Sequence, residues 1–293
     1  MSAGKWRPIA VFNALGARKV FNWMPDEMYL KIQYRLALHK RLDLKNPVTY
    51  NDKIQWLKIH DRKPEYTMMV DKYAVRKYIA ETIGEQYLIP MVGGPWDKFE
   101  DIDFDGLPDQ FVLKCNHDSG GLVICKDKSK LDKRAAEKKI KKSLSRNFYW
   151  GTREWPYKDV KPCIYAEKYM VDDSGYELKD YKFFCFNGIP KVMFIATDRN
   201  VSTKFDFFDM DFNHLPFTNG HPCAKVPPQK PKCFEEMKRL AGILSTGIKQ
   251  LRVDFYEING AVYFGELTFS HWSGMVPFEP EEWDRKLGEW IEI

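Results

Sequence analysis

The sequence has no apolar run approaching the ~18 residues that a membrane-spanning helix needs, which argues against a transmembrane span. It has six cysteines, without a C-x-x-C pair and without the spacing of a metal site. Single scattered cysteines are typical of buried free thiols in a reducing compartment. We therefore expect a cytoplasmic protein.

The N-terminal region lacks the cleavage site of a signal peptide. The segment Ile9–Ala17 is apolar, but Arg18 and Lys19 follow it where small residues belong. We expect a first helix here. Basic and aromatic residues alternate around it, which also suits peripheral contact with a membrane surface.

Internal repeats, low-complexity segments and a P-loop of the form G-x-x-x-x-G-K-[ST] are missing as well, and the last absence disfavours P-loop NTPases. What is present is ordinary globular composition. The chain has 293 residues, 44% of them hydrophobic and 30% charged, with a formal net charge of +5. These values argue against a disordered chain and allow one large domain or two small ones.

Positive charge is concentrated in one stretch. Between Lys126 and Arg146 there are ten Lys or Arg and three Asp or Glu, a local charge of +7. Such a helix could bind nucleic acid or an anionic membrane. An apolar stripe runs along the same segment at Leu131, Ala136, Ile140 and Leu144. We interpret the lysines as the solvated face of a packed helix and do not expect nucleic-acid binding.

Helical patterns dominate residues 24–90. One helix opens at Pro25, and two more are predicted over Asn51–His60 and Asp71–Ile83. Residues 90–110 are rich in Pro and Gly and predict a domain boundary. Strand-like segments follow at Phe111–Cys115, Cys163–Met170, Tyr181–Phe186, Lys191–Thr197, Gln250–Tyr256 and Ala261–Thr268. Strands and helices that mix without strict βαβ alternation predict an α+β fold.

The last two of these strands form a predicted hairpin with charged residues on both arms. A two-residue turn at Asn259-Gly260 would pair Asp254 with Gly265 and put Glu266 on the opposite face. A three-residue loop would bring four side chains to one face: Arg252, Asp254, Glu266 and Thr268. Oxygen ligands of this kind suit Mg²⁺ that carries a nucleotide's phosphates, and the arginine suits a developing anion. The alternative is a hairpin with a solvated charged face.

A second candidate element is Lys114, which ends an apolar strand just before the loop Asn116–Gly121. A lysine followed by small and polar residues fits phosphate binding, through its charge and through free backbone N–H groups. Many strand connections share this pattern, so it is a weak signal alone.

Taken in order, these elements resemble the ATP-grasp superfamily. Lys114 matches its strand lysine, and the loop matches its phosphate-covering loop. Glu167-Lys168-Tyr169-Met170 resembles its adenine-binding strand, and Asp180-Tyr181-Lys182 is similar to a D-x-R pattern of amino-acid-ligating members. The metal-binding hairpin is matched by Arg252-x-Asp254 and Glu266. An early phosphate-contacting lysine is matched by Asp71-Lys72.

Within the superfamily, the chain resembles the TupA-like branch of teichuronopeptide biosynthesis. The similarity runs from about residue 25 to the C-terminus. It is carried by Asn46-Pro47-x-Thr49-Tyr50-Asn51-Asp52-Lys53-Ile54-Gln55-Trp56-Leu57, Asp71-Lys72-Tyr73, Ile89-Pro90 and Phe111-Val112-Leu113-Lys114-Cys115-Asn116-His117. The resemblance implies a helical region over 1–95, a first lobe with the phosphate loop over 96–165, and a second lobe with the metal hairpin over 166–293.

The resemblance also implies an ADP-forming carboxylate–amine ligase that works through an acyl phosphate. It would join an amino acid or amine to a uronic-acid sugar in surface polysaccharide (capsule) biosynthesis. Arg252 would stabilise the tetrahedral oxyanion, and Asp254, Glu266 and Thr268 would hold Mg²⁺. The residues implied in ATP binding are Lys72, Lys114, Asn116, His117, Ser119, Gly120, Gly121, Glu167, Lys168, Tyr169, Met170 and Lys182, with Asp180 or Glu177 on the ribose.

Two points remain open. Thr268 stands where the family pattern has asparagine, which puts a second metal in doubt. Substrate residues are proposed only from their polar, loop-like surroundings: Arg199, Lys204, His221 and His271. The competing hypotheses are a sugar kinase on the same scaffold, a metal-dependent glycosyltransferase using Asp209-Met210-Asp211 or Asp101-Ile102-Asp103, and a non-catalytic binder.

Overall fold

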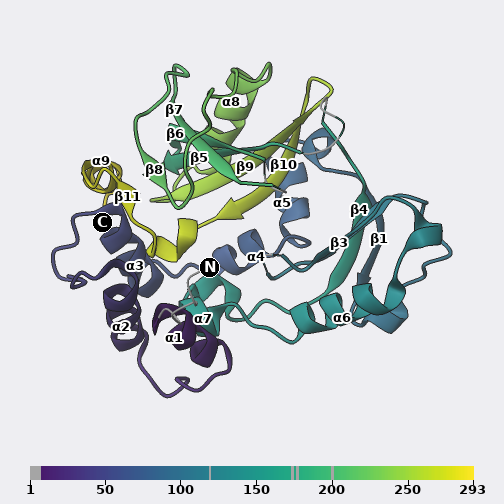
Figure 1. Cartoon of the computed structure of the whole chain (residues 1–293), viewed down its shortest axis with the longest axis horizontal. Helices are drawn as coiled ribbons and strands as arrows, with labels where there is room; N and C mark the ends of the chain where they lie inside the picture. The colour runs from purple at the N-terminus through teal and green to yellow at the C-terminus, as the bar shows by residue number, and fades with distance from the viewer. Residues whose placement is uncertain (1–7, 119, 173–174, 176–177, 199–200) are drawn as a thin grey trace.

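The structure is a computed structural model of the whole chain, and it describes residues 8–118, 120–172, 175, 178–198 and 201–293. Helices near the N-terminus lie beside two antiparallel sheets, one of four strands and one of five (Figure 1). The predicted α+β class is confirmed.

The N-terminal helices include α1 (Pro8–Ala17), α2 (Asp26–Leu38), α3 (Tyr50–His60), α4 (Glu65–Val70) and α5 (Val75–Thr82). The predicted starts of α2 and α3 are confirmed. A capping box opens α3, because Thr49 and Asp52 exchange side-chain and backbone hydrogen bonds at 3.1 and 3.2 Å. The helix predicted from Asp71 begins only at Val75, since the Asp71 carboxylate accepts two backbone N–H groups and holds a turn.

The four-stranded sheet has the order β1-β4-β2-β3. Its strands are β1 (Met91–Trp96), β2 (Phe111–Cys115), β3 (Leu122–Cys125) and β4 (Ile164–Lys168). Helix α6 (Lys133–Leu144) packs against it through Ala136 and Ile140, which lie in one core cluster with Phe111 and Leu113. The apolar stripe of the basic segment therefore packs on the sheet, as predicted.

The predicted domain limits do not follow this sheet. Residues 90–110 contain β1, which pairs with β4 and places Met91 opposite Glu167. Limits at 95/96 and 165/166 fall inside β1 and β4, so they cut the sheet twice. Strand pairing depends on a partner distant in the sequence, and here it overrides the local Pro and Gly signal. Limits before β1 and after β4 keep the sheet whole.

The five-stranded sheet has the order β10-β9-β5-β6-β7. Its strands are β5 (Asp180–Phe186), β6 (Ile189–Thr197), β7 (Lys204–Asp209), β9 (Leu251–Ile258) and β10 (Ala261–Thr268). Helix α8 (Phe234–Leu244) belongs to the core on one face, and α3 and α9 (Glu282–Glu289) belong to the core on the other. A further α-helix is α7 (Tyr149–Thr152), and β8 (Thr218–Asn219) pairs with β11 (Phe278–Glu279) in a third, two-stranded sheet.

The hairpin β9–β10 combines parts of both predicted arrangements. Its turn is the two-residue one, with Asn259 and Gly260 at φ of 52° and 74°. A bulge at Gly265 then shifts the register, giving the pairs Glu266–Asp254 and Thr268–Arg252. A Cβ on Gly265 would lie 3.0 Å from the carbonyl oxygen of Asp254, so glycine suits this bulge. The bulge, not the turn, brings the four polar side chains to one face.

The cysteines are free thiols. Cys115, Cys125, Cys163 and Cys185 are buried as predicted, whereas Cys223 and Cys233 are half-buried. Within the described ranges, no helix combines the length and the apolar character needed to cross a membrane.

Candidate active site

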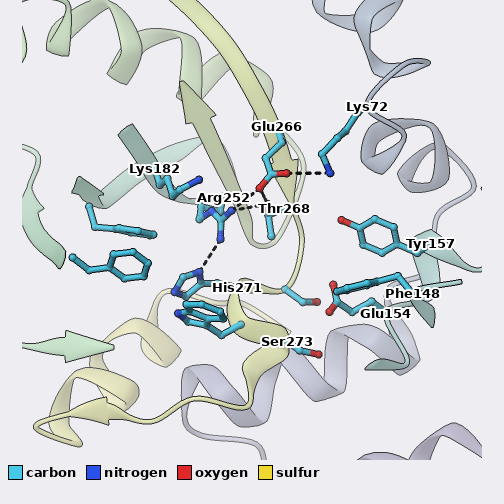
Figure 2. Close-up of a pocket in the computed structure, with 14 residues that line it drawn as sticks. Lys72, Phe148, Glu154, Tyr157, Lys182, Arg252, Glu266, Thr268, His271 and Ser273 are labelled. Carbon is cyan, nitrogen blue, oxygen red and sulfur yellow. Dashed lines mark hydrogen bonds and ion pairs between the residues drawn. The ribbon is translucent and has the colours of Figure 1, made fainter. Parts of the chain in front are cut away.

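A cluster of charged side chains covers one face of the five-stranded sheet, where β5, β9 and β10 are neighbours (Figure 2). Its cations are Lys182, Arg252 and, from the turn before α5, Lys72. Its carboxylates are Asp180, Asp254 and Glu266. The structure thus brings together residues that the sequence predicted to act together.

Arg252 is the centre of the cluster. Its side chain is buried, and its Nε and Nη2 both donate to the Asp254 carboxylate at 2.7 Å. Nη2 also donates to Glu266 and to the Thr268 hydroxyl, each at 3.0 Å. A guanidinium held by a bidentate pair cannot rotate freely. Its orientation toward β10 is therefore fixed before any substrate binds.

Lys182 is buried beside two carboxylates. Its Nζ forms an ion pair with Asp254 and another with Asp180 at 3.1 Å. Burial alone would lower the pKa of Lys182, but the charges of Asp180 and Asp254 raise it above its ordinary value. Lys182 therefore stays cationic at neutral pH.

Glu266 is the most exposed carboxylate of the three, with 31% of its side chain accessible. Its second oxygen lies 3.3 Å from Lys72 Nζ, and Lys72 also donates to the carbonyl oxygen of Asp118 at 2.8 Å. Burial works to raise the pKa of Glu266, but Lys72, Lys182 and Arg252 hold it well below its usual range. Glu266 is therefore ionised.

His271 forms a hydrogen bond with the Arg252 guanidinium. Arg252 Nη1 donates to His271 Nδ1 at 2.8 Å, so the other ring nitrogen donates to Asn219 Oδ1 at 2.9 Å. Burial and the charges of Arg252 and Lys182 hold the pKa of His271 well below its ordinary value. His271 lines the cavity, but only 3% of the residue is exposed and both ring nitrogens have protein partners. That it binds substrate directly stays a prediction.

A cavity of about 390 Å³ opens in front of this cluster. One part of its wall is aromatic, with Phe194, Phe205 and Trp272. The part that faces the cluster comes from the segment around α7 and from the turn after β10. Its residues include Phe148, Glu154, Tyr157 and Ser273.

A second cavity lies between the two sheets, lined by β2, β3 and β4 and by Tyr256 of β9. Lys114 and the predicted adenine-binding residues Glu167, Lys168, Tyr169 and Met170 line it together, with aliphatic walls from Ile89, Val112, Leu122 and Ile124. Glu167 is 5% exposed and accepts from Arg76 at 2.8 Å and from Lys114 at 2.5 Å. Its carboxylate fixes the lysine at the cavity wall.

A family model described as TupA-like ATP-grasp matches residues 52–292. The chain belongs to this family. The predicted resemblance is confirmed, and with it the ATP-grasp fold. A search of curated proteins found no match.

Solved structures give further, weaker similarities. The D-alanine–D-alanine ligase of Bacillus anthracis, solved with ATP, aligns at 18% identity and a TM-score of 0.40 over 69% of this chain and 54% of the ligase. The Helicobacter pylori D-alanine–D-alanine ligase aligns at 12% and 0.42 over 83% of this chain and 69% of that one. The N5-carboxyaminoimidazole synthase of Aspergillus clavatus aligns at 12% and 0.41 over 71% and 46%. The chain thus spans about half the length of the first of these. The family assignment rests on the family model alone.

The predicted phosphate loop of this ATP-grasp chain needs a partial correction. Asn116 and His117 are 1% and 3% exposed, and they bond Asp71, the Cys163 N–H and the Ser143 carbonyl instead of facing a cavity. Their side chains hold the base of the loop through these hydrogen bonds. Gly121 is also packed, because a Cβ there would lie 2.1 Å from Ser143 Oγ. Gly120 is exposed, and Ser119 lies outside the described residues.

Three other predicted site residues of the described chain line neither cavity: Asp180, Lys204 and His221. Glu177 and Arg199 lie outside the described residues. Asp180 is 3% exposed and pairs with Lys182, which leaves it an internal charge partner rather than a ribose ligand. Lys204 is the first residue of β7, and neither cavity includes it. The His221 ring centroid lies 4.6 Å from that of Phe205, which belongs to the aromatic wall.

The two D-x-D sequences have local structural roles. Asp209 accepts the N–H groups of Asp211 and Asn213 at 2.9 and 2.8 Å, so it organises a turn. Asp101 accepts the Lys98 N–H, and Asp103 accepts the Gly106 N–H, each at 3.2 Å. These bonds account for both sequences without a metal.

Several cavity residues were missed from the sequence. Glu154, Tyr157 and Ser273 lie in segments without helix or strand periodicity, and no motif marks them. The one available signal is the polar run Thr268–Ser273 at and after the end of β10. Lys58 of α3 links the two segments, because its Nζ donates to the carbonyl oxygens of Thr152 and Ser273, and local sequence does not encode this contact.

Proposed function

We propose that this chain is an ATP-dependent carboxylate–amine ligase that releases ADP. The observation that carries the proposal is the convergence of Arg252, Asp254 and Glu266 on one face, opposite Lys72 and beside Lys182. Two carboxylates next to three cations form a site that can hold a metal ion and a triphosphate at once.

The carboxylates of the cluster suit magnesium if they exchange their present cationic partners for the metal ion. Asp254 and Glu266 are now neutralised by Lys182, Lys72 and Arg252. A bound triphosphate would draw the lysines away, and the released carboxylates, with the Thr268 hydroxyl, would hold Mg²⁺. The ion would neutralise charge on the transferred phosphoryl group.

The second cavity suits the adenine end of the nucleotide. Aliphatic walls and the 167–170 segment suit an adenine ring, and Lys114 stands at its edge. We propose that Lys114, Lys72 and Lys182 contact the phosphates, so the nucleotide would run from this cavity toward the charged cluster.

The reaction then follows from these positions. A substrate carboxylate attacks the γ-phosphate of ATP, giving an acyl phosphate and ADP. An amine displaces the phosphate, and Arg252 stabilises the oxyanion that forms on the carbonyl oxygen. By analogy with the family, we propose a uronic-acid sugar as the carboxylate and an amino acid or amine as the nucleophile, in surface polysaccharide biosynthesis.

The test is product analysis. ADP release from ATP is measured with magnesium against panels of uronic-acid sugars and amino acids, and hydroxylamine is added to trap an acyl phosphate as its hydroxamate. Hydroxamate or amide formation supports the ligase. A sugar phosphorylated on a hydroxyl group, formed without any amine, overturns the ligase proposal in favour of a kinase.

Lys114→Ala should weaken MgATP binding by about 10- to 100-fold, the usual effect of losing a hydrogen bond to a charged group. Calorimetry with MgATP measures the change. Lys130→Ala is the matched control, because that side chain is 82% exposed and lines neither cavity. Unchanged affinity in the Lys114 variant would refute its role at the phosphates.

A further inference from the structure

The wall of the first cavity that faces Arg252 carries a carboxylate without an assigned role. Glu154 follows shortly after α7, and only 4% of its surface is exposed. It lines the same cavity as Arg252 and Glu266. Figure 2 shows its carboxylate and the Tyr157 hydroxyl directed toward the side that holds Arg252 and Thr268.

A hydrogen-bonded chain from α3 holds this carboxylate. Lys58 is 4% exposed, and its Nζ donates to the Ser273 hydroxyl at 2.7 Å and to the Ser273 carbonyl at 2.8 Å. Because an ammonium can only donate, the Ser273 hydroxyl keeps its own proton for its bond to Glu154. Burial raises the pKa of Glu154, and the charge of Lys58 opposes that shift.

The backbone is strained on both sides of the Glu154–Ser273 contact. Arg153 has a φ of 55°, and Trp272 and Ser273 have φ of 50° and 58°. Left-handed conformations cost free energy for residues other than glycine, and they gather at functional sites. Arg153 is fixed by a 2.7 Å bond to the Phe21 carbonyl and by the Tyr29 ring, 4.2 Å from its guanidinium carbon. The surrounding structure thus holds Glu154 in one place.

The charges divide the cavity into two ends. Lys182 and Arg252 on the sheet and Lys72 from the turn before α5 gather at one end, where an anionic substrate group fits, and Glu154 stands on the opposite wall. Phe148 and Tyr157 border Glu154. A carboxylate that shares a cavity wall with aromatic rings is suited to an organic ammonium, through the ion pair and through the ring faces.

We propose, on the basis of the proposed ligase function, that Glu154 binds the ammonium group of the amine substrate and accepts a proton from it. Ser273 and Lys58 are positioning residues for this carboxylate. The proposal assigns the two substrates to opposite walls, with the acyl phosphate at Arg252 and the nucleophile at Glu154.

In the proposed step, the ammonium loses a proton to Glu154 and the amine then takes the acyl group from phosphate. An N–H bond of the ammonium breaks, its proton goes to Glu154, and the nitrogen keeps the electron pair. That pair forms the C–N bond with the acyl-phosphate carbon, while the carbonyl oxygen takes the negative charge near Arg252. The C–O bond to phosphate then breaks, inorganic phosphate leaves, and the remaining extra proton on nitrogen passes to solvent.

The first test measures amine binding without turnover. The probes are the standard amino acids, their carboxamides and ethanolamine, added to the chain with MgADP and followed by saturation-transfer NMR and calorimetry. We expect Glu154→Gln to weaken the tightest amine by about 100-fold, as for a lost partner of a buried charge pair, and Glu154→Asp to retain most of the affinity. Equal affinity in Glu154→Gln, or no amine bound by the wild type, overturns the proposal.

Two controls separate this role from folding. Glu154→Gln leaves Lys58 without its nearby counter-charge, so the double variant Lys58→Met/Glu154→Gln removes both buried charges. MgADP affinity and thermal unfolding show whether each variant is folded. We expect the double variant to bind MgADP normally and still to lose the amine; amine binding retained in it contradicts the proposal.

Turnover gives an independent readout. Hydroxylamine is largely uncharged at neutral pH and brings no ammonium to Glu154. We expect Glu154→Gln to form hydroxamate at nearly the wild-type rate, while KM for the amine rises about 100-fold. Equal loss of both reactions would mean a merely structural role. If the wild type releases no ADP with any substrate, the proposed function fails, and the binding comparison still decides the role of Glu154.

Discussion

Glu266→Gln should lower MgATP turnover by at least about 100-fold while the chain stays folded. The substitution keeps the shape of the side chain and removes one negative charge. Glu266 is the most solvent-accessible of the three clustered carboxylates, and it has cationic partners on two sides, Lys72 and Arg252. An amide in its place binds magnesium weakly but can still accept a hydrogen bond from Arg252. The loss should therefore be one of chemistry rather than of structure.

The measurement is steady-state ADP release over a magnesium titration. We expect the apparent magnesium requirement to rise and the maximal rate to fall, with thermal unfolding close to that of the wild type. Glu282→Gln, on an exposed position of α9, is the matched control and should behave as the wild type. Full activity of Glu266→Gln would remove the proposed metal site.

The β9–β10 hairpin shows which features of this site could be predicted from the sequence. The residue types and their alternation predicted which side chains share a face along each strand, and Asn259-Gly260 predicted the turn. Neither predicted pairing was complete, because the bulge at Gly265 moves the register by one residue between the turn and Glu266. A glycine within a strand indicates a bulge. The position of this bulge is evident only from the fold, where the Asp254 carbonyl lies close to Gly265.

The loop after β2 shows where the sequence misleads. Asn116 and His117 are polar residues beside a lysine and two glycines, which is typical of a phosphate loop. In the fold, Asn116 satisfies the Cys163 N–H and Asp71, and His117 bonds a carbonyl of α6. Buried polar groups need partners, and these partners lie 26 to 47 residues away in the chain. Spacing along the chain does not contain that information.

Asp254→Asn should destabilise the chain by about 3–5 kcal/mol, because removing one member of a buried ion pair leaves its partners uncompensated. Asp254 is 1% exposed and neutralises both Arg252 and Lys182. We expect a loss of folding stability first, because the Asp254 carboxylate accepts hydrogen bonds from both Arg252 and Lys182. Urea unfolding, monitored by fluorescence, measures the change.

A double variant shows whether the loss arises from the unpaired lysine. Lys182→Met together with Asp254→Asn removes one charge of each sign, so the two effects should not add, and we expect a coupling of about 1–3 kcal/mol. Additive losses would mean that Lys182 and Asp254 do not stabilise each other in the folded chain. Because Asp254 is also a proposed magnesium ligand, the nucleotide is added here as ATP with EDTA, without a metal ion. Metal-free ATP should narrow the stability gap for the Asp254→Asn variant if Lys182 contacts phosphate, because a bound triphosphate replaces the missing negative charge. Stabilisation by metal-free ATP that is no larger than in the wild type would place Lys182 outside the phosphate site while leaving the buried ion pair intact.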